Sequence, residues 1–319
     1  MRQRHVVVGA GPVGLATARE LVAAGHDVVL ASRSGTGPEL AGVERVAADA
    51  ADADRLTELA MSEGVGGGAH ALYNCINPPS YDVWSTYWPP VAAAFLEAAE
   101  RSGAVLVTAS CLYGYGPLDV PMVEGMPDAA PGTKGRLRAQ MWADALAAHE
   151  AGRIRAVEVR GSDYMGAGIT SAHVPMVTPR ALSGHSVWMI GRPDQPHSFT
   201  DVRDMGRALA AVATDERAWG RVWHAPTNPA VTSSQAVADV CAAVGRPPVT
   251  VHGVPRWALH AAGWFSPMMR ELRETAYQFE RPYVLDSSAI TRELGLAPTP
   301  WADVCRATAT NEVADPALR

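Results

Sequence analysis

Glycines near the N-terminus have the spacing of a turn that binds phosphate. They follow a short apolar stretch, residues 5–9, and precede a stretch with helical periodicity, residues 12–24. They belong to the hexapeptide Gly9-Ala10-Gly11-Pro12-Val13-Gly14. Glycine permits close approach of the backbone to a ligand, and the first N–H groups of the helix attract negative charge. The pattern predicts a site for the pyrophosphate of a dinucleotide, the alternative being a tight turn without a ligand.

The end of the next apolar stretch, residues 27–31, bears on which dinucleotide is bound. It continues into Ser32 and Arg33. An acidic residue here suits the ribose 2′-hydroxyl of NAD, whereas an arginine suits the 2′-phosphate of NADP. Arg33 offers a charged fork and Ser32 a hydroxyl donor, so the sequence predicts NADP(H) in preference to NAD(H). An ordinary surface arginine is the alternative.

Polar residues are also expected at the ends of the third and fourth strands. Asp49 ends the expected third strand, where it could accept a hydrogen bond from the adenine amino group or be a plain loop aspartate. Asn74 and Asn77 follow the fourth strand. Because the carboxyl ends of parallel strands line the ligand crevice, both asparagines could contact the nicotinamide half or the substrate, the alternative being a rigid loop formed by Pro78-Pro79.

The elements that would position these residues alternate along the chain. Apolar stretches typical of buried strands are 5–9, 27–31, 46–49, 70–74, 104–109 and 155–160. Helical spacing is found over 12–24, 53–61, 91–101, 136–151 and 202–214. Such alternation indicates parallel strands joined by right-handed crossovers. We therefore predict an α/β fold, with a doubly wound Rossmann-type sheet in residues 1–165. A smaller C-terminal substrate-binding region, residues 166–319, is expected to send segments back to the sheet.

Two features of the second half have plain structural interpretations. Asp201 and Asp204 lie one helical turn apart, and we expect Asp201 to cap the helix over residues 202–214 while an arginine offsets the charge. The stretch 257–269 carries Trp257, Trp264, Phe265 and two methionines. It would either pack in a core or line an apolar substrate pocket, and core packing is the prediction.

Composition narrows the class of protein. The chain has 319 residues and a net charge of −6, which disfavours a general binder of nucleic acid or of anionic membranes. Four cysteines are scattered without metal-ligand spacing, and ten histidines show none either, so neither a disulfide framework nor a metal site is expected. No apolar stretch is long enough for a signal peptide or a membrane span. These features predict a cytoplasmic location.

Four later segments, with the glycine turn, resemble the extended short-chain dehydrogenase/reductase superfamily, which includes nucleotide-sugar epimerases and dehydratases. The segments are 110–114, 160–166, 199–204 and 286–300. Their order matches over almost the whole chain. The resemblance implies that Ser110 hydrogen-bonds the substrate carbonyl and that Tyr113 and Tyr164 line the substrate pocket. It also implies a homodimer packed through the helices 91–101 and 136–151.

The chain departs from this family at the catalytic motif. The family uses Tyr-x-x-x-Lys at the start of the long helix, where the lysine lowers the tyrosine pKa and holds the nicotinamide ribose. Here Lys134 stands in the place of the tyrosine and Arg138 in that of the lysine. No tyrosine occurs between Tyr115 and Tyr164.

Three interpretations of this departure remain. In the first, Arg138 holds the ribose and Lys134 transfers the proton, since a neighbouring cation disfavours its charged form. In the second, Tyr113, Tyr115 or Tyr164 supplies the proton from a loop. In the third, the protein binds NADP(H) as a structural or sensing ligand without redox turnover. We expect an NADP(H)-dependent oxidoreductase or epimerase-like enzyme, acting on a small carbonyl, alcohol or sugar-derived substrate.

Overall fold

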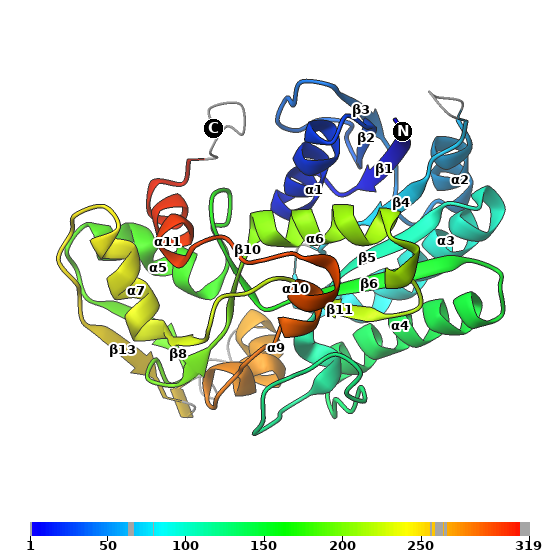
Figure 1. Ribbon diagram of the computed structural model, residues 1–319. Coiled ribbons are helices and arrows are strands. Elements are labelled where there is room, and N and C mark those ends of the chain that lie inside the picture. The colour runs from blue at the N-terminus through cyan, green and yellow to red at the C-terminus, as the bar shows by residue number, and fades with distance from the viewer. Residues whose placement is uncertain are drawn as a thin grey trace.

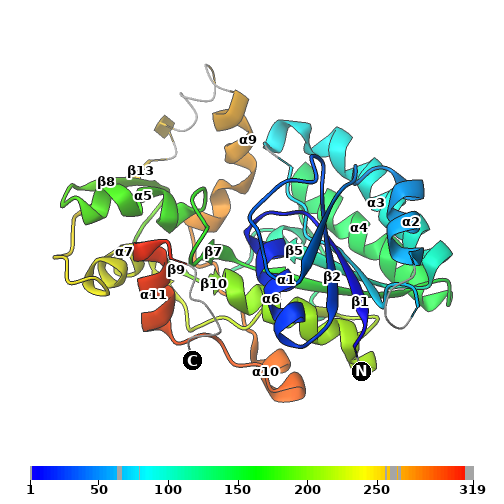
Figure 2. The same cartoon turned by 90° about the horizontal axis from the view of Figure 1, so that it is seen from above.

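A computed structural model describes residues 2–62, 67–78, 80–255, 257–258, 264 and 267–312, and omits the side chains of 267–270. Its centre is one parallel sheet with the strand order β11-β6-β5-β4-β1-β2-β3 (Figures 1 and 2). The strands are β1 (Arg4–Val8), β2 (Asp27–Ser32), β3 (Val43–Ala47), β4 (Ala71–Asn74), β5 (Val105–Cys111), β6 (Arg155–Gly161) and β11 (Val222–His224). The order reverses between β1 and β4, and ligands bind at such a reversal in open α/β sheets.

Helices cover both faces of this sheet. One face is covered by α1 (Pro12–Ala23) and α6 (Val202–Thr214), and the other by α2 (Ala53–Met61), α3 (Trp84–Ser102) and α4 (Thr133–Glu150) (Figure 2). Neighbouring residues of β1 belong to different cores, Val7 with α1 and α6, and Val6 with α2, α3 and α4. The strands are therefore buried on both faces, which explains their continuous apolar sequences.

A smaller lobe lies beside the carboxyl ends of the strands (Figures 1 and 2). Its helices α5 (His173–Leu182), α7 (Ser233–Ala242) and α11 (Trp301–Thr310) share a core with β8 (Val187–Ile190), which pairs with β13 (Val251–Val254). Two further ladders join β7 (Asp163–Met165) to β10 (Phe199–Asp201), and β9 (Pro196–His197) to β12 (Val231–Thr232). The segments α9 (Pro267–Thr275) and α10 (Ser288–Leu294) complete the C-terminal half.

The prediction of a Rossmann-type α/β fold is confirmed. Late segments return to the sheet: β11 is its edge strand, and α6 and α10 pack against it. The predicted bounds differ in two places. The helix expected to start at residue 91 begins at Trp84, although Pro89 and Pro90 lie inside it and remove two N–H donors. Burial of Trp84 and Trp88, one turn apart on α3, offsets that loss. The third strand is Val43–Ala47 and not 46–49, so Asp49 comes after it.

The core packing predicted for the tryptophan- and methionine-rich stretch is wrong for its two tryptophans. Trp257 is 74% exposed and Trp264 is 78% exposed, so neither packs in a core. Phe265 and the methionine side chains at 268 and 269 lie outside the described residues. Among the helices that the structure describes, none has the length and apolar character needed to cross a membrane.

Candidate cofactor and substrate site

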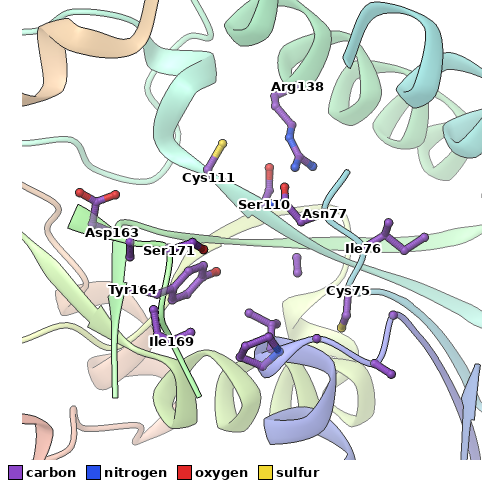
Figure 3. A pocket seen from close by; sticks show the side chains of 18 of the residues that line it. Cys75, Ile76, Asn77, Ser110, Cys111, Arg138, Asp163, Tyr164, Ile169 and Ser171 are labelled. Carbon is purple, nitrogen blue, oxygen red and sulfur yellow. The ribbon is translucent and has the colours of Figure 1, made fainter. Parts of the chain in front are cut away.

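A cavity of about 620 Å³ lies at the carboxyl ends of the strands, between the sheet and the smaller lobe (Figure 3). Its walls are the glycine turn at residues 9–13, the ends of β2, β5 and β6, the start of α3, and residues 168–172. Gln278 and Tyr283 line it from the C-terminal half. One continuous cavity thus connects the turn after β1 to the smaller lobe.

The glycine turn has the geometry that its sequence pattern predicts. Gly9 has a φ of +114°, and a Cβ there would lie 2.6 Å from the carbonyl oxygen of Cys75. A Cβ on Gly14 would overlap the carbonyl oxygen of Gly9, so both positions require glycine. Around Gly11 a Cβ would meet no atom within 4 Å, and no side chain caps the N-terminus of α1. Its first N–H groups are thus available to an anion at the cavity.

Arg33 is an exposed cation at the rim of this cavity, where β2 ends. No described residue pairs with its guanidinium, whereas nearby Arg45 is paired with Glu39 at 3.0 Å. Ser32 also lines the cavity, and its hydroxyl donates to the Thr36 carbonyl oxygen at 3.0 Å. The rim at this end therefore presents one unpaired positive charge.

The three polar residues predicted to contact a ligand from the ends of the third and fourth strands lie in different environments. Asp49 accepts a hydrogen bond from the Ala51 N–H at 3.0 Å and is not part of the cavity wall, which favours the loop interpretation. The Asn74 side chain is buried and accepts from the Ile76 N–H at 3.3 Å, so it stabilises the turn after β4. Of the two asparagines, only Asn77 lines the cavity.

Arg138 and Ser110 bring unsatisfied polar atoms into the middle of the cavity. The Arg138 side chain, only 6% exposed, points toward Ser110 and Asn77 (Figure 3). Among the described residues, its Nε and Nη1 have no hydrogen-bond partner, and neither has the Ser110 hydroxyl. Buried polar groups without partners are rare in proteins, so these atoms mark where a polar ligand would bind.

Lys134, one turn before Arg138 on α4, has a different environment. Its Nζ lies 2.5 Å from Glu271 Oε2 and 3.1 Å from Glu274 Oε2, and its N–H donates to Glu274 Oε1 at 2.6 Å. Lys134 is buried and does not line the cavity. Two carboxylates of α9 neutralise its charge, and this arrangement does not favour its predicted role in proton transfer.

Of the three tyrosines considered for proton transfer, Tyr113 and Tyr164 line the cavity and Tyr115 does not. The Tyr113 hydroxyl lies 2.7 Å from that of Tyr81, which also lines it. Burial raises the pKa of Tyr81 to about 12 and raises the pKa of Tyr113 and Tyr164 further, so all three are neutral phenols near pH 7. The Tyr115 hydroxyl is instead bound to His224 Nε2 at 2.8 Å, in a buried network outside the cavity.

The cavity also contains residues that the sequence analysis did not single out. Asp163 lies in the 160–166 segment of the family resemblance, where its neighbour Tyr164 drew attention instead. Tyr283 carried no signal, because β9 and its neighbours bring it to the cavity from the far end of the chain. Its hydroxyl has no hydrogen-bond partner among the described residues.

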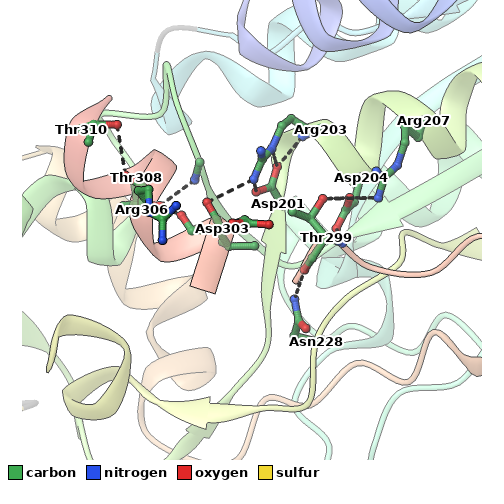
Figure 4. Close-up of polar contacts among 12 residues, drawn as sticks. Asp201, Arg203, Asp204, Arg207, Asn228, Thr299, Asp303, Arg306, Thr308 and Thr310 are labelled. Atoms are coloured by element: carbon green, nitrogen blue, oxygen red, sulfur yellow. Dashed lines mark hydrogen bonds and ion pairs between the residues drawn. The ribbon is translucent and has the colours of Figure 1, made fainter. Parts of the chain in front are cut away.

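The structural role predicted for Asp201 is confirmed. Its carboxylate caps α6 by accepting from the Arg203 N–H at 2.7 Å, and the Arg203 side chain pairs with it (Figure 4). Asp204 pairs with Arg207 and accepts from the Thr299 N–H at 2.7 Å. Burial raises the pKa of Asp204 to about 6. These contacts tie α6 to the C-terminal segment and are not part of the cavity.

The comparison with protein families agrees with this geometry. The sequence model described as "NAD dependent epimerase/dehydratase family" matches residues 5–224. The chain belongs to this family. No curated protein was found to match it. The resemblance stated from the sequence motifs is thus confirmed for the epimerase/dehydratase family.

Solved structures share the epimerase/dehydratase fold over nearly the full chain. The dTDP-glucose 4,6-dehydratase of Bacillus anthracis, solved with NAD, is 14% identical with a TM-score of 0.77. The match covers 97% of this chain and 96% of that chain. The UDP-glucose 4-epimerase of Thermotoga maritima, solved with UDP-glucose, is 15% identical with a TM-score of 0.75, covering 97% and 98%. An epimerase of Methanothermobacter thermautotrophicus is 16% identical with a TM-score of 0.77, covering 97% and 92%.

Proposed function

We propose that this protein is an NADP(H)-dependent oxidoreductase of the epimerase/dehydratase type that acts on a small carbonyl or alcohol. One observation carries the proposal. The same cavity joins a glycine turn with the geometry for pyrophosphate to the unpartnered polar atoms of Ser110 and Arg138. A dinucleotide bound along the turn would bring its nicotinamide toward those atoms, at the switch point of the sheet.

The preference for NADP(H) rests on Arg33. Its guanidinium is exposed at the rim, and no described carboxylate neutralises it. A 2′-phosphate would supply the missing partner with paired, charge-assisted hydrogen bonds. NAD has no group at that place that needs a cation.

The residues in the middle of the cavity suit a redox site. When bound, the nicotinamide would give or accept a hydride at the substrate carbon. Arg138 would hold the nicotinamide ribose through its unpartnered N–H groups, and Ser110 would donate to the substrate oxygen. The proton would come from a tyrosine that lines the cavity, Tyr113 or Tyr164. If Tyr113 gives the proton, its hydrogen bond with Tyr81 offers a path by which that proton would be replaced.

A second candidate function is binding of NADP(H) without turnover. It is favoured by the absence of Tyr-x-x-x-Lys and by the raised pKa of the cavity tyrosines, which makes them poor proton donors. The two functions differ in one assay. The full-length protein is mixed with NADPH and a panel of aldehydes and ketones, and the loss of NADPH absorbance is recorded. Turnover that is lost in Ser110→Ala and in one of Tyr113→Phe and Tyr164→Phe supports the enzyme, whereas NADPH binding with no turnover supports the binding protein.

The assembly of the protein is a separate part of the proposal. The family resemblance implies a homodimer through α3 and α4, which lie side by side on one face of the sheet. Light scattering at micromolar concentration tests this. A mass of one chain would exclude the dimer.

A further inference from the structure

The half of the cavity nearest the smaller lobe contains a carboxylate. Of the charged side chains that line the cavity in the described part of the chain, Arg33 lies at the rim and Arg138 in the middle. Asp163 lies on the side of the smaller lobe (Figure 3). It is the first residue of β7, separated from the end of β6 by one residue, where the ligand edge of the sheet passes into the lobe.

The fold holds Asp163 in place through His197. β7 pairs with β10 in the register Asp163↔Phe199, which brings β9 and its His197 alongside. His197 Nε2 lies 3.1 Å from Asp163 Oδ2, and His197 Nδ1 lies 3.2 Å from the Gln278 carbonyl oxygen. A carbonyl oxygen only accepts, so Nδ1 carries a proton, and an attraction between Nε2 and the carboxylate requires a proton on Nε2 as well. The imidazole is buried and stacked against Phe279 and Tyr283, so its orientation is fixed.

Asp163 is ionised at neutral pH. Burial alone would raise its pKa, but the neighbouring His197 outweighs burial and holds the pKa below its ordinary value. Burial lowers the pKa of His173 to about 4, so that ring is neutral. The phenols around Asp163, at Tyr81, Tyr113 and Tyr283, are neutral as well because burial raises their pKa. Apart from His197, the groups named here around the Asp163 carboxylate are uncharged.

Aromatic rings surround this carboxylate. Besides Tyr87, four tyrosines line the same cavity: Tyr81, Tyr113, Tyr164 and Tyr283. The faces of aromatic rings attract cations, and a carboxylate among such rings is a common way to bind an ammonium group. A carboxylate offers only acceptor oxygens, so it cannot donate a hydrogen bond to a phosphate or to another carboxylate.

The cations that a diphosphate would need are absent from this end in the described residues. Arg180 donates to the Ser186 carbonyl oxygen, Arg192 pairs with Asp194, and Arg273 is exposed on α9. None of the three lines the cavity. Arg256 and the side chain of Arg270 lie outside the described residues.

We propose that the substrate of this protein carries an ammonium group, which binds against Asp163 between the tyrosines, and that nucleotide diphosphates are excluded from this end. The inference rests on the proposed function in one respect: the compound bound here is the one oxidised or reduced. Selection by charge at Asp163 does not depend on turnover.

Three small probes of similar size and different charge test the inference. Ethanolamine is cationic, ethylene glycol is neutral and glycolate is anionic. Their affinities are measured by ligand-observed NMR on the full-length protein, with and without NADP+, and UDP-glucose is measured by calorimetry. We expect ethanolamine to bind at least about tenfold more tightly than ethylene glycol, glycolate to bind most weakly and UDP-glucose not to bind.

Two variants extend the test. Asp163→Asn keeps the size of the side chain and removes its charge, so ethanolamine should lose its advantage over ethylene glycol. Asp119→Asn is the matched control, because Asp119 is 84% exposed and does not line the cavity. It should keep the wild-type order. If Asp163→Asn does not fold, the order of the three probe affinities in the wild-type protein alone decides whether the inference holds.

The inference is overturned if glycolate or ethylene glycol binds as tightly as ethanolamine, if none of the three binds, or if UDP-glucose binds more tightly than all of them. Failure of the proposed function has a different signature. If NADP+ does not bind, the oxidoreductase proposal falls, while the order of the three probes without cofactor still decides the role of Asp163.

Discussion

Arg138 stacks on Trp88, with its Cζ 4.0 Å from the ring centroid, and directs unpartnered nitrogens into the cavity. Trp84 flanks the same guanidinium at 5.0 Å. The rings fix the orientation of the cation and leave its N–H groups to a ligand. In the proposed function this arrangement would let Arg138 serve where the family has a lysine, with both tryptophans supplied by α3.

The first prediction concerns this arginine. Arg138→Met keeps a flexible side chain against Trp88 but removes the charge and the donors. Hydrogen bonds to a charged group contribute about 1.5–3 kcal/mol, so NADPH affinity should fall by roughly 10- to 100-fold. Calorimetry measures the change, and Arg138→Lys should recover part of it. An unchanged affinity in Arg138→Met would remove Arg138 from the cofactor site.

The second prediction separates Lys134 from catalysis. Lys134→Met should leave NADPH affinity within about twofold of wild type, because Lys134 does not line the cavity. It should lower the free energy of unfolding by about 1–3 kcal/mol, because Glu271 and Glu274 lose their partner. Denaturant unfolding gives the second quantity. The double variant Lys134→Met/Glu271→Gln should be less destabilised than the sum of the two single variants. Loss of turnover with unchanged stability would instead support proton transfer by Lys134.

The third prediction concerns stability against pH through His5. His5 is fully buried, and its Nδ1 lies 2.9 Å from the Tyr73 hydroxyl. Burial, then the charges of His26 and His70, lower its pKa to about 3. In the unfolded chain the pKa is about 6.5, so between these values the unfolded state binds the extra proton. The stabilisation from neutral His5 is fully present above about pH 6.5 and is lost as the pH falls toward 3.

The variant His5→Gln isolates this effect from the other titrating groups. The difference in free energy of unfolding between wild type and variant should be constant above about pH 6.5. Below it, the difference should shift against the wild type by up to about 1.4 kcal/mol per pH unit. Chemical denaturation at a series of pH values measures it. A difference that does not change between pH 7 and pH 4 would mean that His5 is not held neutral.

The parts predicted from the sequence are those that depend on local patterns. The strands and most helices follow from periodicity, and the glycine turn follows from the local spacing of Gly9, Gly11 and Gly14. Lys134 shows where such reasoning stops. Its spacing to Arg138 matched a catalytic motif, but its partners Glu271 and Glu274 are more than 130 residues away in the sequence.

Asp163 and Tyr283 show the same limit, as cavity residues that local patterns did not identify. Neither belongs to a local motif that specifies its role. Their position in one cavity depends on the pairing of β7 with β10 and on the bridge between His197 and Tyr283. Such contacts join distant parts of the chain, and spacing along the sequence does not contain them.

Titration of the full-length protein with NADPH and, separately, with NADH, followed by calorimetry, tests the central claim most directly. The proposed function predicts that NADPH binds at least about tenfold more tightly than NADH and that Arg33→Ala removes this difference by weakening NADPH alone. Equal affinities in wild type and in Arg33→Ala would contradict the NADP(H) preference. Binding of neither cofactor would contradict the oxidoreductase itself.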